Sequence, residues 1–240
     1  ETANTSYIIG LADHRTFVGH VYYGRRVRGQ DLRYLLRTGE APFVPSENER
    51  ERCSFYDTFP SEYSGNGVGD YRESSIAVRT QAGQHAVMPT YVSYEITDQK
   101  PELPGLPSAF DRENTAQTLI LHCRDEVLQL DVDLYYTVFE ENDMITRSVR
   151  ICNHSKEAVY LTKAYSACLD MDDDGYEMLT LHGSWARERH IQTRPLAYGK
   201  QLVSSFRGES GHQEHPFIAL LTPGTNQKSG KVYGMHFVYS

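Results

Sequence analysis

The segment 59–73 contains residue types that can bind a hydroxyl-rich small molecule. Asp70 supplies a hydrogen-bond acceptor, Tyr71 a flat ring with a hydroxyl, and Arg72 a forked donor. A polyol such as a sugar offers hydroxyls around its edge and an apolar C–H face on which a ring can stack. The glycines that precede this triplet at alternate positions are Gly65, Gly67 and Gly69. Because they lack a Cβ, the backbone there is free to adopt positive φ or to lie flat against another surface.

The glycine spacing does not indicate a nucleotide site, because the helix that should follow it and bind phosphate is missing from the pattern. A plain glycine-rich hairpin has the same composition. On the residues alone, a sugar-facing loop and a structural hairpin both remain open interpretations of this segment.

The elements that must position this segment are strands, because period-two alternation of apolar and polar residues dominates the chain. In 127–138, for example, Leu128, Leu130 and Val132 point to one side, whereas Gln129 and Asp131 point to the other. Strands are predicted over 6–12, 17–23, 76–80, 90–96, 118–123, 127–138, 144–152, 158–169, 178–184, 187–192, 200–205, 217–222 and 231–239. Only 29–38 has apolar residues at helical spacing. The pattern predicts an all-β fold, a large antiparallel two-sheet β-supersandwich.

The two long loops, 38–52 and 97–115, lack the length and low complexity of an interdomain linker. We therefore predict a single β-supersandwich domain over 1–240. The chain begins with Glu1 rather than Met, and its last residues, 235–240, still have a strand pattern. We expect an N-terminal fragment trimmed from a longer protein.

Composition narrows the class of partner. The net charge of −8 and the lack of a basic stripe argue against nucleic acid. No apolar run approaches the roughly 20 residues of a membrane span, and no signal peptide is visible. The cysteines show no Cys-x-x-Cys spacing, which favours reduced thiols in a cytoplasmic protein. They are Cys53, Cys123, Cys152 and Cys168.

Two segments resemble metal sites only in part. In 170–175, acidic residues stand at positions one, three and five and glycine at six, as at the start of a calcium loop, but position twelve is Leu181 rather than glutamate. An acidic turn explains this segment better. His212 and His215 lack the glutamate of a zinc helix, and Pro216 prevents a helix from continuing. We therefore predict no metal.

Longer motifs carry a more specific signal. They are Tyr-Ile-Ile-Gly at 7–10, Gly-His-Val-Tyr-Tyr-Gly-Arg-Arg at 19–26, Ser-Phe-Tyr-Asp-Thr-Phe-Pro-Ser-Glu-Tyr at 54–63, the glycine-rich segment, Gly-Ser-Trp-Ala-Arg-Glu-Arg-His at 183–190 and Gly-His-Gln-Glu-His-Pro-Phe-Ile-Ala-Leu at 211–220. In this order and over nearly the whole chain, they resemble the amino-terminal domain of bacterial α-galactosidases of glycoside hydrolase family 36.

The resemblance implies a parent enzyme that removes terminal α-linked galactose from melibiose- and raffinose-type oligosaccharides with retention of configuration and without a cofactor. It implies that both catalytic aspartates belong to a (β/α)8 barrel that follows this domain, so we expect the 240-residue chain to be inactive alone. It also implies partners: the enzyme's own barrel and neighbouring subunits, commonly in a homotetramer.

The resemblance further implies that loops of this domain reach the active-site mouth of a neighbouring subunit. Two loops match that role: an upstream loop with Glu40 and Phe43, and the glycine-rich segment with Asp70, Tyr71 and Arg72. Phe43 or Tyr71 would stack on sugar units beyond the galactose. Glu40, Asp70 and Arg72 would form hydrogen bonds with sugar hydroxyls.

Within the chain, the carboxylates closest to one another in sequence are Asp57, Glu62, Asp70 and Glu73. Glycoside hydrolysis needs a pair of this kind, but the resemblance argues against a catalytic role for them. Two alternatives stay open beside the galactosidase domain: a stand-alone carbohydrate-binding β-sandwich and a purely structural module.

Overall fold

The structure is a computed structural model that describes residues 1–29, 31–38, 55–209 and 211–238. It divides into two compact units. Unit 1 consists of Glu1–Pro101 and Asp111–Met171, and unit 2 of Glu102–Phe110 and Asp172–Ser240. The single-domain assignment of 1–240 stays a prediction beside this division.

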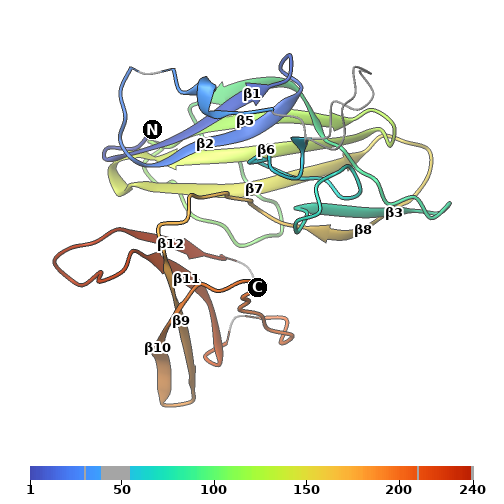
Figure 1. Cartoon of the computed structure of the whole chain (residues 1–240). Helices are drawn as coiled ribbons and strands as arrows, with labels where there is room; N and C mark the ends of the chain where they lie inside the picture. Colours follow the sequence, from blue (N-terminus) through green and yellow to red (C-terminus); the bar gives the residue numbers. More distant parts are fainter. Residues whose placement is uncertain (30, 39–54, 210, 239–240) are drawn as a thin grey trace. The chain divides into compact units, whose positions relative to one another are not determined.

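The described residues of unit 1 form three antiparallel sheets (Figure 1). The largest has four strands in the order β4-β5-β6-β7, and two further sheets pair β1 with β2 and β3 with β8. The strands are β1 (Thr5–Ala12), β2 (Phe17–Arg25), β3 (Ile76–Thr80), β4 (Thr90–Thr97), β5 (Gln117–Asp125), β6 (Leu130–Phe139), β7 (Met144–Asn153) and β8 (Val159–Ala164).

The register of β5 against β6 follows from the alternation in the sequence. Leu121 lies opposite Leu134, and both side chains are buried. One residue along, on the other face, His122 lies opposite Asp133, and Nδ1 of His122 is 2.7 Å from Oδ1 of Asp133. A shift of one residue would exchange these faces, so the pattern specifies the pairing.

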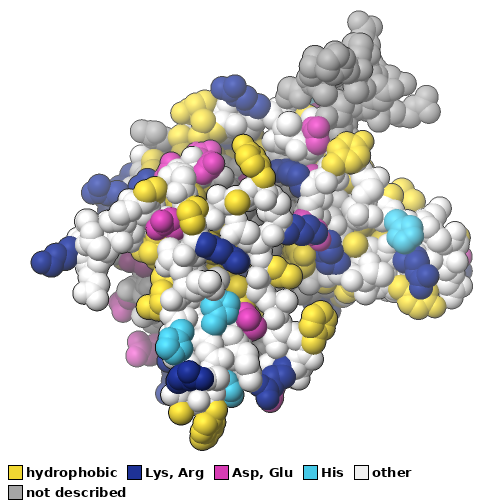
Figure 2. Space-filling model, turned by 60° about the horizontal axis from the view of Figure 1, so that its bottom comes forward, with side chains coloured by type: hydrophobic (Ala, Val, Ile, Leu, Met, Phe, Trp, Pro, Cys, Tyr) yellow, Lys and Arg dark blue, Asp and Glu magenta, His cyan; other side chains and the backbone are white. Residues whose placement is uncertain are grey.

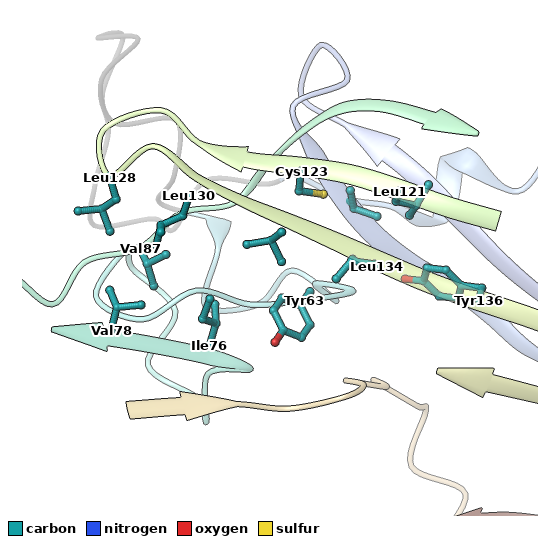
Figure 3. Packing of buried hydrophobic residues seen from close by; sticks show 12 residues of the cluster. Tyr63, Ile76, Val78, Val87, Leu121, Cys123, Leu128, Leu130, Leu134 and Tyr136 are labelled. Atoms are coloured by element: carbon teal, nitrogen blue, oxygen red, sulfur yellow. The ribbon is translucent and has the colours of Figure 1, made fainter. Parts of the chain in front are cut away.

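The main core of unit 1 lies between this sheet and the segments that face it. Figure 3 shows Leu128 and Leu130 beside Val87, with Ile76 and Val78 on β3 across from them, and Leu134 farther along β6 toward Tyr136. A second cluster is aromatic and packs edge to face; its buried members are Ala12, Phe17, Phe55, Tyr56 and Phe59. Such ring pairs stabilise beyond their buried area.

Unit 2 is one antiparallel sheet in the order β10-β9-β11-β12. Its strands are β9 (Glu177–Ser184), β10 (Arg187–Pro195), β11 (Glu214–Leu221) and β12 (Val232–His236). Met178 and Ala219 are its buried apolar residues on the strands. At the turn between β9 and β10, the backbone N–H of Ala186 donates to Glu188 Oε1 at 2.9 Å.

The predicted all-β antiparallel fold is confirmed. One local prediction, a strand over 200–205, is wrong. Residues 200–205 form no strand, and Leu202 is exposed, so their alternation does not correspond to a buried face. The helical spacing in 29–38 gives a single 3-10 turn, Arg33–Leu35, with no buried residue.

The composition of the chain can be compared with the charged side chains and the cysteines in the structure. On the face in Figure 2, basic and acidic side chains are interspersed. Cys123, Cys152 and Cys168 are free thiols, and Cys53 lies outside the described residues. Among the residues described, no helix is long and apolar enough to cross a membrane.

Candidate functional site

The glycine-rich segment is a closed loop, here called the Gly loop, over residues 64–75. The carbonyl oxygen of Ser64 accepts hydrogen bonds from Ser75 N at 2.9 Å and Ile76 N at 3.2 Å. The two ends of the loop therefore meet at the start of β3, as in a compact Ω-loop.

Glycine is required at the start of the Gly loop by close packing. A Cβ on Gly65 would lie 1.8 Å from the carbonyl oxygen of Val87. Farther along, Gly69 has a φ of +99°, in the region that side chains disfavour. The alternate glycines thus allow the backbone of the loop to pack closely against residues 86–87.

Asp70 and Arg72 form a forked ion pair inside the loop. Nε of Arg72 lies 3.0 Å from Oδ1 of Asp70, and Nη2 lies 3.0 Å from Oδ2. The Asp70 side chain is only 2% exposed. The hydrogen bond to Asp70 raises the pKa of Arg72. Asp70 is therefore occupied in holding the guanidinium.

Arg72 extends this pair to the rest of unit 1. Its Nη2 donates to the carbonyl oxygen of Phe59 at 2.6 Å, and its Nη1 to Oδ2 of Asp170 at 3.0 Å. Asp170 is a residue that the sequence assigned to an acidic turn. Charged hydrogen bonds of this kind are the strong ones, so the loop tip is firmly attached.

Tyr71 lies between these two anchored residues in the sequence. Its side chain is 90% exposed. A ring held on a fixed backbone and open to solvent can stack on an apolar face of a ligand. Among the predicted site residues that the structure describes, Tyr71 thus has the side chain most open to such a contact.

A small polar cavity of about 40 Å³ lies beside Arg72. It is lined by Ser61, Ser64, Asp70, Arg72, Glu73, Cys168 and Asp170. This volume accommodates ordered water. It is too small for a sugar ring.

Glu62, just before the Gly loop, is fully buried in a second network. Arg147 Nη1 lies 2.9 Å from its Oε1, and Tyr136 donates to the same oxygen at 2.9 Å. Tyr7 also donates to Oε1, and Nδ1 of His20 is 3.3 Å from Oε2. The Arg147 guanidinium stacks over the Tyr136 ring at 3.9 Å.

The electrostatics of this network are those of a structural ion pair. Burial alone would raise the pKa of Glu62, but the charge of Arg147 and the hydrogen bond from His20 outweigh it, and the pKa is lowered. Burial, together with the charge of Glu62, raises the pKa values of Tyr7 and Tyr136, so both hydroxyls stay protonated and can donate.

The remaining predicted residues are placed as follows. Glu73 forms an ion pair with Lys163 and accepts a hydrogen bond from Tyr165 at 3.3 Å. Asp57 is half-buried. Glu40 and Phe43 lie outside the described residues.

The acidic segment forms a turn, since Gly175 N donates to Oδ1 of Asp173 at 2.8 Å. The described residues contain no group of three or more His, Cys, Asp or Glu that could hold a metal ion. In unit 2, Nδ1 of His182 instead pairs with Glu214 Oε2 at 3.1 Å.

Arg147 is the residue that sequence reasoning missed. It shares a face of β7 with Val149 and Ile151, which pack against the main core. A charged residue at an inward strand position signals a buried partner, because an unpaired buried charge is costly. That signal was present in the alternation of 144–152.

Comparisons with known proteins agree with these motifs. Residues 16–240 match the model of the glycosyl hydrolase family 36 N-terminal domain. The chain is 38% identical to α-galactosidase Mel36A of Lactobacillus acidophilus, covering 98% of this chain and 32% of that protein. It is 37% identical to α-galactosidase AgaA of Geobacillus stearothermophilus, with the same two coverages.

Solved structures give the same result. The crystal structure of AgaA superimposes with a TM-score of 0.90 at 33% identity, over 98% of this chain and 33% of that one. The α-galactosidase of Lactobacillus brevis gives 0.89 at 35% identity, over 98% and 32%. This chain therefore spans about a third of the length of these relatives, and it belongs to the N-terminal domain family of glycoside hydrolase family 36.

Proposed function

We propose that this chain is the N-terminal part of an α-galactosidase that hydrolyses terminal α-galactosides of the melibiose and raffinose type by a retaining mechanism. The relatives support this, because they are named α-galactosidases, and variants of AgaA were crystallised with raffinose and with stachyose. The parent is a cytoplasmic enzyme without a cofactor.

The chain itself is not catalytic in this proposal. Its carboxylates Glu62, Asp70 and Glu73 are each bound to a cationic side chain of the same unit. Retaining hydrolysis needs two carboxyl groups about 5 Å apart that face the sugar. We assign the catalytic aspartates to a barrel outside this chain.

The role of the chain is in assembly and in shaping the substrate pocket of a neighbouring subunit in a homotetramer. The observation that supports this best is the exposure of Tyr71 between the anchored residues Asp70 and Arg72. Tyr71 stacks on sugar units beyond the galactose, and Arg72 donates to their hydroxyls while Asp70 holds it. Glu40 and Phe43 contribute from the upstream loop.

The first experiment compares hydrolysis of a nitrophenyl α-galactoside by the 240-residue chain and by the full-length protein. We expect activity only in the full-length protein. Activity in the short chain would contradict the proposal and place catalytic carboxylates here. Activity in neither protein would favour a stand-alone carbohydrate-binding module, which affinity chromatography on immobilised raffinose would detect.

The second experiment tests Tyr71→Ala in the full-length enzyme. We expect KM for raffinose to rise several-fold, because the stacking of an aromatic ring on the apolar face of a sugar is worth about 1 kcal/mol. KM for the nitrophenyl galactoside should change much less. Tyr94→Ala, at an exposed tyrosine on β4, is the matched control and should affect neither substrate. Equal effects of Tyr71→Ala on both substrates would exclude the stacking role.

A further inference from the structure

Residues from four strands converge on the buried Glu62. They are Tyr7 on β1, His20 on β2, Tyr136 on β6 and Arg147 on β7. Three of the sequence motifs, those containing Tyr7, His20 and Glu62, therefore meet at one point. The proposed function uses none of these three side chains.

Glu62 belongs to the segment that leads into the Gly loop. The backbone of this segment runs along β2: His20 N donates to Pro60 O at 2.7 Å, and Glu62 N donates to Val18 O at 3.0 Å. Two residues later, Ser64 closes the loop. Main chain and side chain thus fix the start of the loop together.

A buried ion pair is a poor way to gain stability alone. Its desolvation penalty is large, and apolar residues of similar volume often stabilise a core as well or better. What the pair offers is position, because Arg147 Nη1 contacts both Glu62 and the Tyr7 hydroxyl, at 2.9 and 2.8 Å. An apolar side chain at position 62 would have no directional partner to fix its place along β2. The carboxylate of Glu62 is fixed in one place by its directional contacts.

We propose that the Glu62–Arg147 pair is a latch that positions the Gly loop, so that Glu62 is a positioning residue for the surface presented by Tyr71. The consequence for sugar specificity rests on the proposed function. The positioning of the Gly loop by Glu62 does not rest on the proposed function, and it is measured separately.

The test is amide hydrogen exchange of the full-length protein, read over 63–73. In Glu62→Gln we expect exchange there to accelerate by about tenfold, because the loop opens locally. Exchange in β5 (Gln117–Asp125), a core strand, follows global unfolding and reports the loss of global stability in the same sample. Ile120→Ala is the control: it removes buried apolar volume on the face of β5 opposite Leu121 and should leave 63–73 protected.

The double variant Glu62→Gln/Arg147→Met separates an effect on the position of the Gly loop from an effect on the global stability of the protein. It leaves no uncompensated charge, so global stability should recover while 63–73 still exchanges fast. Recovery of loop protection together with stability would overturn the latch. Unchanged exchange in Glu62→Gln would overturn it too. If neither of these variants folds, Tyr136→Phe removes one donor to Glu62, and unaltered loop exchange in it would equally refute the proposal.

Kinetics then distinguish the two proposals. With the loop loosened, we expect KM for raffinose to rise and kcat on the nitrophenyl galactoside to stay the same. A loosened loop with an unchanged raffinose KM would support the latch and refute sugar contact by the loop. A loop that does not loosen refutes the latch, whatever the kinetic result.

Discussion

Arg72 ties the tip of the Gly loop back to the segment before it, since its Nη2 donates to the carbonyl oxygen of Phe59 at 2.6 Å. The same guanidinium holds the carboxylate of Asp70 with two parallel hydrogen bonds. The loop is thus a fixed structure that presents the Tyr71 side chain, 90% exposed, to solvent.

Arg72→Ala should destabilise the chain by about 1–3 kcal/mol. The change leaves the Asp70 carboxylate buried without its cation, and an unsatisfied buried acceptor costs this much. The measurement is the free energy of unfolding in urea, followed by circular dichroism.

The chain offers a matched control in Asp31-Leu32-Arg33, which has the same Asp-x-Arg spacing and the same forked bonding. Here both partners are exposed. Surface pairs of this kind contribute little, so Arg33→Ala should leave the unfolding free energy unchanged. Equal losses in Arg72→Ala and Arg33→Ala would show that burial of Asp70 does not matter.

Gly65→Ala should destabilise by about 1–3 kcal/mol or more, because its methyl group would overlap the Val87 carbonyl and a rigid backbone would have to shift. The urea midpoint of unfolding should fall. Gly234→Ala is the control. Its Cβ would lie 3.5 Å from Phe217, which is ordinary contact, and its midpoint should hold or rise slightly. A neutral Gly65→Ala would contradict the tight path of the Gly loop.

The strands were predictable because the alternation of apolar and polar residues is a local pattern. It occurs wherever a sheet has one buried face and one face in solvent. The prediction over 144–152, for example, corresponds to β7 almost residue for residue. It failed over 200–205, where the same alternation lacks a neighbouring strand in the described structure. Period-two alternation is thus not sufficient for a strand, because a strand also needs a neighbour to pair with.

The candidate site was predictable only in part. Asp70, Tyr71 and Arg72 are adjacent in sequence, so their chemical types could be read directly. Asp70 turns inward to Arg72 because Phe59 and Asp170 also bind the Arg72 guanidinium. Asp170 is far from Arg72 along the chain, so the sequence does not reveal that contact. The convergence of Tyr7 and Arg147 on Glu62 is likewise non-local, and no single-sequence pattern specifies it.

Trp185, the single tryptophan, should report on the β9–β10 turn. Its side chain is 83% exposed, so we expect acrylamide to quench its fluorescence readily in the 240-residue chain. In the full-length protein we expect protection, because an exposed ring beside a strand exposed along most of its length is typical of a covered interface. Equal quenching in both proteins would show that this turn is not covered in the full-length protein.

Glu62 should make the chain sensitive to acid. Its pKa in the folded state lies below its ordinary value of 4.5. The folded state therefore binds this proton less readily than the unfolded state does. The stabilisation is fully present above about pH 4.5 and is lost as the pH falls through the lowered pKa.

Glu62→Gln removes this dependence. At neutral pH it should cost about 3–5 kcal/mol, because Arg147 keeps a buried charge without its partner. Below pH 4.5 the gap between parent and variant should narrow, and urea unfolding at a series of pH values measures it. The other carboxylates are common to both proteins, so they cancel in the difference. A gap that stays constant from pH 7 down to pH 3 would mean that folding does not lower the pKa of Glu62.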